Sequence, residues 1–364
     1  MGRCVIRANV AVMSVLRHRR VLRRHQLVAL SIAALLVTGC MGGGPMTSPM
    51  PPTGADTAAA SPDAASPDAA TACAATAAGA EPTQYAGWPP AETFDLVPIP
   101  VSTELAVGPN RFLLNLLDNR NEPLASPDRE VDLRFFNLAR DAAQPALSAT
   151  SSYLPTVESL PGLYRAEVEF SCWGEWGVEA VATEADGSER VGRMIFPVRP
   201  TSSTPALGAP APASVTPTAT TAAEIAAIST DTDPDADFYA DSIDEALAAG
   251  RPFLVIFSTP AFCRTATCGP ALDIVKSVAA DYDSAVTFIH VEPYELATVE
   301  GQLQPVLSDQ NLPIPVEAVT QWGLPTEPYI FVVDAAGMVT AKLEGVASTA
   351  EIEVALDEVT AEGS

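Results

Sequence analysis

The segment that most constrains the fold of this chain is an apolar run, Phe253–Phe257, followed by two closely spaced cysteines, Cys263 and Cys268. Five apolar residues in a row are typical of a strand that is buried on both faces, as in a parallel sheet. Pro270 suits the first turn of a helix, so Cys268 is expected to lie at the start of that helix. A thiolate at a helix start is stabilised by free amide groups and by the helix dipole, and the charge of Arg264 adds to this effect. The segment therefore predicts a strand, a loop and a helix, with a cysteine pair where the loop meets the helix.

The residues on either side of this segment predict a mixed α/β domain. Ser242–Glu245 has the pattern of a capping box that begins a helix, and Gly250 is suited to end it. Ser348–Glu351 has the same capping pattern and is expected to begin the last helix. The further strands that we expect are Val286–Val291, Tyr329–Val333 and Val339–Leu343, and the helix after the cysteines has an apolar stripe of Leu272, Val275, Val278, Ala279 and Tyr282.

A second domain, of β-strands only, is predicted for residues 91–200. Three segments there alternate apolar and polar residues, and turn residues separate them, which favours a β-sandwich. Tyr164 and Trp176 resemble the strand and corner aromatics of immunoglobulin-like modules. Core packing is the favoured explanation of these aromatic residues, and a partner- or ligand-binding face is the functional alternative. The alternating apolar residues are Val131, Leu133 and Phe135, then Tyr164, Ala166, Val168 and Phe170, then Trp176, Val178, Ala180 and Ala182.

The N-terminus predicts export and a lipid anchor. A basic segment precedes the apolar run Leu27–Val37, which is too short to span a bilayer and suits a signal peptide, whether the chain starts at Met1 or at Met13. Leu36–Cys40 resembles the bacterial lipobox, which makes Cys40 the expected lipidation site and residue one of the mature chain. An ordinary signal peptide that happens to end at a cysteine is the alternative. The basic residues are Arg17, Arg19, Arg20, Arg23 and Arg24.

Composition divides the chain into five parts. We expect a lipoprotein signal peptide at 1–39 and a disordered, lipid-anchored tether at 40–90, which is rich in Gly, Pro, Ala, Ser and Thr. The β-sandwich follows at 91–200 and a Pro/Ala/Thr linker at 201–224. The mixed α/β domain completes the chain at 225–364.

The charge of the chain excludes some classes of partner. The whole sequence has 20 Lys and Arg against 45 Asp and Glu, a net charge of −25. Residues 1–39 contain seven of the basic residues and no acidic one, so a chain that begins at Cys40 carries −32. Such a chain repels nucleic acids and anionic headgroups, and its membrane attachment must come from lipid. We expect exported protein substrates or a redox partner, and no nucleic acid.

The order of elements and the cysteine motif together resemble the thioredoxin-fold family over about 225–364. In that family a buried strand leads into an aromatic residue and a cysteine, a short loop, a second cysteine and a helix. Phe262 and Cys263 occupy the first two of these positions. A proline that is cis in the family precedes the third core strand and faces the cysteines; Pro328 fits best, and Pro325 is the fallback.

Three features depart from the family. Four residues, not two, separate the cysteines, and Ala271 stands where a Cys-Gly-Pro-Cys motif beginning at Cys268 would have its second cysteine. The strand Phe253–Phe257 carries no acidic residue that could serve as a buried base.

The resemblance implies thiol–disulfide exchange on exported proteins. By family position Cys263 attacks and Cys268 resolves the mixed disulfide, while Pro328 shapes a groove that Glu327 or Trp322 could line. This makes the extracytoplasmic face of the cell membrane the expected location.

The competing hypothesis is a surface adaptor without catalysis, in which a static Cys263–Cys268 disulfide staples the loop to the helix. We expect no cofactor and no metal, because two thiolates need further ligands and His290 falls in a predicted core strand. Peroxidase chemistry is a weaker alternative, since no arginine follows Arg264 to activate a peroxide. Cys73 and Cys172 either pair, or Cys172 is a buried apolar thiol.

Overall fold

The structure is a computed structural model, and it describes residues 71, 73, 88, 95–156, 161–282 and 285–361. All described residues belong to one compact unit, Ala64–Ser364. The expected signal peptide and the expected lipidation site, Cys40, lie outside the described residues. In the described part of the chain, no helix has both the length and the apolar character needed to cross a membrane.

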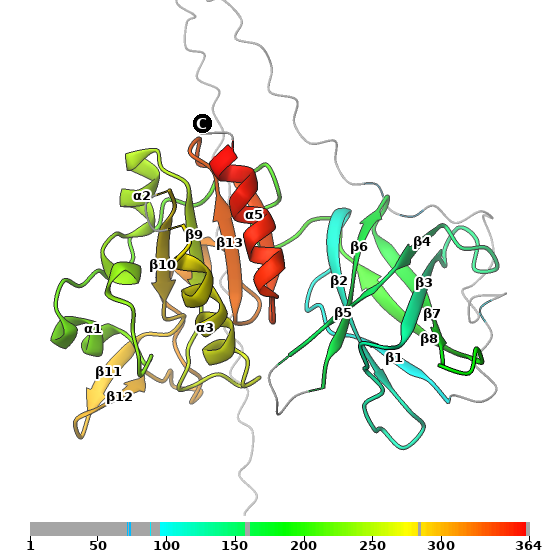
Figure 1. Cartoon of the computed structure of the whole chain (residues 1–364). Coiled ribbons are helices and arrows are strands. Elements are labelled where there is room, and N and C mark those ends of the chain that lie inside the picture. Colours follow the sequence, from blue (N-terminus) through cyan, green and yellow to red (C-terminus); the bar gives the residue numbers. More distant parts are fainter. Residues whose placement is uncertain are drawn as a thin grey trace, which may run out of the picture. The chain divides into compact units, whose positions relative to one another are not determined.

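The N-terminal part of the described chain forms two antiparallel four-stranded sheets (Figure 1). One sheet has the order β1-β2-β6-β5 and the other has the order β4-β3-β7-β8. The first consists of Val97–Pro100 (β1), Gly108–Leu117 (β2), Leu163–Phe170 (β6) and Ser152–Leu154 (β5). The second consists of Leu147–Thr150 (β4), Glu130–Asn137 (β3), Gly174–Thr183 (β7) and Glu189–Val198 (β8).

The predicted alternation decides which side chains fill the sandwich. Val131, Leu133 and Phe135 of β3 are buried, while the residues between them are exposed. The core is rich in aromatic rings that meet edge to face: the Phe135 centroid lies 5.0 Å from Phe112 and 5.7 Å from Phe170. Trp176 packs on Phe170 at 5.0 Å. The corner aromatics are thus core residues, and the prediction of an all-β domain holds for this part of the chain.

A disulfide joins Cys73 to Cys172, with the Cα atoms 5.0 Å apart. The Cys73 amide also donates to the carbonyl of Trp173 at 2.8 Å. Trp88 is buried against Phe136, at 4.8 Å between ring centroids. The described residues of the segment expected as a tether are therefore attached to the sandwich, by a covalent bond and by an aromatic contact.

The C-terminal part contains a mixed four-stranded sheet in the order β10-β9-β13-β14. Its strands are Thr287–Val291 (β10), Phe253–Phe257 (β9), Tyr329–Val333 (β13) and Val339–Glu344 (β14). As expected, every residue of β9 is buried. The strand is parallel to β10 but antiparallel to β13, so full burial here reflects a central position in a mixed sheet and not a parallel sheet (Figure 1).

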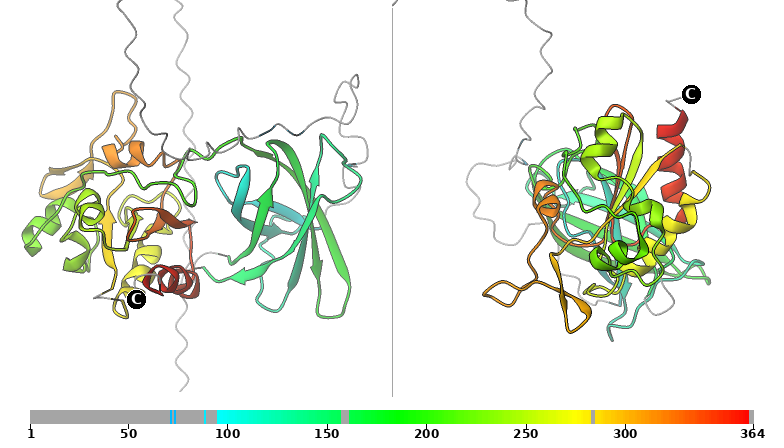
Figure 2. Two further views of the ribbon diagram at one scale, coloured as in Figure 1. Left: turned by 90° about the horizontal axis from the view of Figure 1, so that it is seen from above. Right: turned by 90° about the vertical axis from the view of Figure 1, so that its left-hand side faces the viewer.

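Helices cover both faces of this sheet. Figure 2 shows α3 (Cys268–Ala279) and α5 (Thr349–Ala361) on one side and α4 (Glu317–Gln321) on the other. Leu254 and Ile256 of β9 share a core cluster with α3 and α5, whereas Phe253, Val255 and Phe257 share one with α2 and α4. The helices are Ala222–Ile228 (α1), Ile243–Ala249 (α2), Cys268–Ala279 (α3), Glu317–Gln321 (α4) and Thr349–Ala361 (α5), with a 3₁₀ turn at Ala236–Tyr239 (η1).

The helix ends follow the predicted capping residues. Ser242 precedes α2 with a capping box to Glu245, and Gly250 ends the helix with a φ of 60°. Ser348 precedes α5, where its amide donates to Glu351 at 2.9 Å. Satisfying the free amides at a helix start in this way stabilises the helix and fixes where it begins.

Two connecting segments pack against the sheet. The predicted linker runs beside β14, where Gly208 donates to the Val339 carbonyl at 2.8 Å and Val339 donates to Ala209 at 2.9 Å. The insert between β10 and β13 contains α4 and an antiparallel hairpin, Leu296–Val299 (β11) with Gln302–Pro305 (β12).

The two disulfides should differ in what they contribute to stability. The Cys73–Cys172 disulfide joins residues with a sequence separation of 99, whereas the Cys263–Cys268 disulfide joins residues with a separation of 5. Loop-closure entropy predicts that replacing the first pair by alanine lowers the free energy of unfolding by about 4 to 5 kcal/mol, and the second by about 2 kcal/mol. Denaturant unfolding of the two double variants measures this. An equal or larger loss for Cys263 and Cys268 would contradict it.

Candidate functional site

The Cys263–Cys268 pair lies in the loop between β9 and α3 as a disulfide, with the Cα atoms 5.8 Å apart. Cys268 is the first residue of α3 and is fully buried. Cys263 lies five residues earlier and is partly exposed. One cysteine of the pair is therefore partly exposed, while the other is enclosed by the fold.

The start of α3 contributes directly to the environment of Cys263. The Cys268 amide donates to the Cys263 sulfur at 3.2 Å. The Thr265 hydroxyl lies 3.3 Å from the same sulfur, and a hydrogen bond of 2.7 Å links it to Thr267. Thr267 makes no side-chain cap, so the helix start remains open toward the sulfur. An amide at a helix start that points to sulfur favours the thiolate form once the disulfide is opened.

Pro328 lies at the same edge of the sheet. The peptide bond between Glu327 and Pro328 is cis, and β13 begins at the next residue, Tyr329. Tyr329 pairs with Phe257, the last residue of β9, so Pro328 flanks the point from which the cysteine loop departs. The fallback residue, Pro325, is exposed in the preceding loop.

Polar side chains surround this edge. The Tyr294 hydroxyl donates to Glu327 at 2.9 Å, and burial raises the pKa of the Glu327 carboxyl. The exposed guanidinium of Arg264 acts in the opposite direction on that pKa. Glu327 is partly exposed, and its expected place in a binding groove stays a prediction.

The expectation that Trp322 lines the groove is wrong. Trp322 is fully buried, with its ring 4.7 Å from Phe331 and 5.5 Å from Phe257. It belongs to the core cluster that α2 and α4 form with the sheet. The free energy of burying a large aromatic ring exceeds what the same ring would gain at a partly wet groove.

A buried histidine supports the start of the cysteine loop. His290 of β10 lies 3.0 Å from both the carbonyl and the hydroxyl of Ser258, and 2.9 Å from the Tyr239 hydroxyl. Because a carbonyl only accepts, Nε2 carries the proton and Nδ1 accepts from Tyr239. Burial lowers the pKa of His290 to about 4, so the ring is neutral. His290 is thus structural, and both of its nitrogens are occupied.

A buried acid, Glu292, lies at the same edge and was not expected from the sequence. Its Oε1 accepts from the amide of Thr230 at 2.7 Å and from its hydroxyl at 2.5 Å. The Thr230 hydroxyl in turn accepts from the Ala261 amide at 3.2 Å, two residues before Cys263. Burial raises the pKa of Glu292. The signal that could have found it is its position directly after β10, since parallel strands end at one edge.

The comparisons with known proteins assign no family. No family model and no curated protein matches the chain. Among solved structures, "MTB dsbF in its mixed oxidized and reduced forms" is 23% identical over 32% of this chain and 86% of that one, with a TM-score of 0.24. The "PmoD soluble domain from Methylocystis sp. ATCC 49242 (Rockwell)" is 18% identical over 28% of this chain and 88% of that one, at 0.16. With TM-scores this low, neither likeness assigns a fold or an activity.

The neutral state of His290 predicts a dependence of stability on pH. The pKa falls from 6.5 when unfolded to about 4 when folded, so the stabilisation is present above pH 6.5 and is lost as pH falls through 4. This amounts to about 3 kcal/mol. We expect His290→Gln to have a lower free energy of unfolding than the wild type at pH 7. Between pH 7 and 4 its free energy of unfolding should fall by about 3 kcal/mol less than that of the wild type. Denaturant unfolding at both pH values measures it. An unchanged pH dependence in the variant would contradict the assignment.

Proposed function

We propose that this chain is a membrane-anchored, extracytoplasmic thioredoxin-like protein that exchanges disulfides with exported protein partners through Cys263 and Cys268. The observation that carries the proposal is the asymmetry of the disulfide at the start of α3. Cys263 is partly exposed and its sulfur accepts an amide hydrogen bond, while Cys268 is fully buried. A purely structural staple gains nothing from an exposed sulfur beside a helix start, whereas exchange needs it.

The arrangement around the disulfide supports a docking edge for a partner chain. Pro328 and Glu327 precede β13, next to the strand end from which the cysteine loop departs. Arg264 is exposed in the loop itself. Pro328 itself is buried and Glu327 is partly exposed, so a partner that approaches Cys263 would meet charged side chains of both signs on a backbone edge that Pro328 shapes. Such an edge suits an extended polypeptide better than a small apolar ligand.

Exchange proceeds in two steps with a balanced transfer of two electrons. In the direction that reduces a partner, the Cys263 thiolate attacks one sulfur of the partner disulfide, and the other partner sulfur leaves as a thiolate and takes up a proton. The Cys268 thiol then loses its proton and attacks Cys263. The mixed disulfide breaks, the Cys263–Cys268 disulfide forms, and the partner leaves as a dithiol. The reverse sequence oxidises a partner dithiol.

Anchoring at the outer face of the membrane rests on the sequence. The basic and apolar segments that precede Cys40 support export and lipidation of that cysteine. The disulfide between Cys73 and Cys172 agrees with an oxidising compartment. With a net charge of −32 from Cys40 onward, the chain has no electrostatic attraction to anionic lipid, so a covalent lipid would supply the attachment.

A trapping experiment tests the assignment of the two cysteines. The probe is a disulfide-linked pair of unstructured peptides, added to the reduced full chain. Cys268→Ser should accumulate a mixed disulfide at Cys263, since no second thiol releases it. Cys263→Ser should react at least about tenfold more slowly, because Cys268 is buried. Mass spectrometry of the trapped species gives the site and the rate.

The wild-type chain is the matched control and should release the peptides while forming the Cys263–Cys268 disulfide. A faster reaction of Cys268 would reverse the two roles. If neither variant forms a mixed disulfide, the exchange function fails, and a stapled adaptor becomes the better account of this part of the chain.

A further inference from the structure

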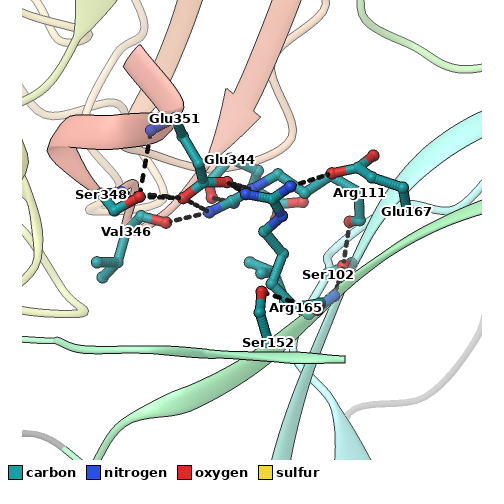
Figure 3. Close-up of polar contacts among 10 residues, drawn as sticks. Ser102, Arg111, Ser152, Arg165, Glu167, Glu344, Val346, Ser348 and Glu351 are labelled. Atoms are coloured by element: carbon teal, nitrogen blue, oxygen red, sulfur yellow. Dashed lines mark hydrogen bonds and ion pairs between the residues drawn. The ribbon is translucent and has the colours of Figure 1, made fainter. Parts of the chain in front are cut away.

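Arg111 of β2 reaches from the sandwich to the turn between β14 and α5 (Figure 3). Its side chain is 8% exposed. Nη1 donates to the Glu344 carbonyl at 2.8 Å, and Nη2 donates to the Val346 carbonyl at 2.7 Å. Nε and Nη2 also donate to the carboxylate of Glu351, at 2.7 and 3.1 Å. One guanidinium thus holds two backbone carbonyls and one carboxylate.

The residue between those two carbonyls is bound to the candidate site. Gly345 has a φ of 69°, a conformation that suits glycine, and its amide donates to the Pro328 carbonyl at 2.9 Å. The contacts therefore form a short chain from Arg111 to the backbone around Gly345, and from Gly345 to Pro328. Pro328 in turn lies at the strand start next to the cysteine loop.

The carboxylate of Glu351 fixes the other end of the turn. It accepts from the Ser348 amide at 2.9 Å, as part of the cap of α5, and it pairs with Arg165 of β6 at 3.0 Å. Burial alone would raise its pKa, but the hydrogen bonds and charge of Arg111 hold the pKa below its usual value. The group is therefore ionised at neutral pH, and its side chain is 6% exposed. A buried carboxylate of this kind requires its cationic partners to stay in place.

We infer that Arg111 is a positioning residue for the exchange site: the β-sandwich sets the place of Pro328 through the turn at residues 344–346. This inference rests on the proposed function and assigns the sandwich a part in it. A guanidinium is suited to the task because its fixed fork of donors addresses several acceptors at once, which a lysine ammonium does not do in the same geometry. Pro328 is buried, so Arg111 acts on the surface beside Cys263 through the backbone at Pro328 and the partly exposed Glu327 that precedes it. The place of this edge then depends on a residue more than 100 positions earlier in the sequence.

The test compares Arg111→Lys with Arg165→Lys in the full chain. Both variants keep a positive charge near Glu351, but Arg165 pairs only with the carboxylates of Glu351 and Glu167 among its ion pairs. The probes are the disulfide-linked peptide pair and hydroxyethyl disulfide, which is too small to need a docking edge. For Arg111→Lys we expect the exchange rate with the peptides to fall by about ten- to a hundredfold, because the docking edge would be misplaced. The exchange rate with hydroxyethyl disulfide should stay the same, because this probe does not need the edge.

Hydrogen exchange of the Gly345 amide is a second readout that does not depend on activity. Arg111→Lys should speed this exchange, and Arg165→Lys should leave it close to wild type. Equal losses with both probes, or equal effects of the two variants, would reduce Arg111 to a general stabiliser and overturn the inference. If Gly345 loses protection but the wild-type chain does not react with the peptides, the coupling stands and the proposed function fails.

Discussion

The position of the candidate site depends on the burial of β9 between two neighbours of opposite direction. β9 is parallel to β10 and antiparallel to β13, so the end of β9, the end of β10 and the start of β13 lie at one edge. The cysteine loop leaves from the first, Glu292 follows the second and Pro328 precedes the third. Every residue of β9 is buried. A shift of one residue in its strand pairing would move each side chain to the opposite face of the sheet, so the strand register at this edge is strongly specified.

Where the cysteine loop meets the sheet, buried polar side chains take the place of apolar packing. His290 is bonded to Ser258 and Tyr239, and Glu292 to Thr230, which also receives the Ala261 amide. The bonds to Ser258 and to Ala261 fix the first part of the cysteine loop to β10 and to Thr230. The loop can then leave Cys263 partly exposed while its first residues stay fixed to the sheet.

Local patterns in the sequence predicted the local parts of this structure. The run Phe253–Phe257, the caps at Ser242 and Ser348 and the helix start at Cys268 each depend on residues within a few positions of one another. The choice of Pro328 over Pro325 came from the resemblance to the thioredoxin-fold family and from the apolar residues that follow it. The alternation of apolar and polar residues in the sandwich strands was also predictable from the sequence, since successive side chains of a strand point to opposite faces of the sheet.

Features that depend on distant residues were not predictable. The contact of Arg111 with Glu351 spans 240 positions, and nothing near either residue indicates the other. Trp322 was expected as a possible lining residue of the groove that Pro328 shapes, but its ring is buried in the core with Phe257 and Phe331. Glu292 becomes a neighbour of the cysteine loop only through the parallel pairing of β9 with β10, which brings the two strand ends together. Periodicity and caps are local properties of a sequence, whereas packing decides which distant polar groups meet.

The reduction potential of Cys263–Cys268 tests the central claim most directly. The full chain is equilibrated with dithiol buffers of graded potential, and mass spectrometry after alkylation follows both disulfides in the same sample. The account predicts a Cys263–Cys268 potential between about −120 and −270 mV, as for exchange enzymes, while Cys73–Cys172 stays oxidised until below about −300 mV. If both pairs resist reduction to the same potential, Cys263–Cys268 is a structural staple, and the account of this protein as an exchange enzyme is contradicted.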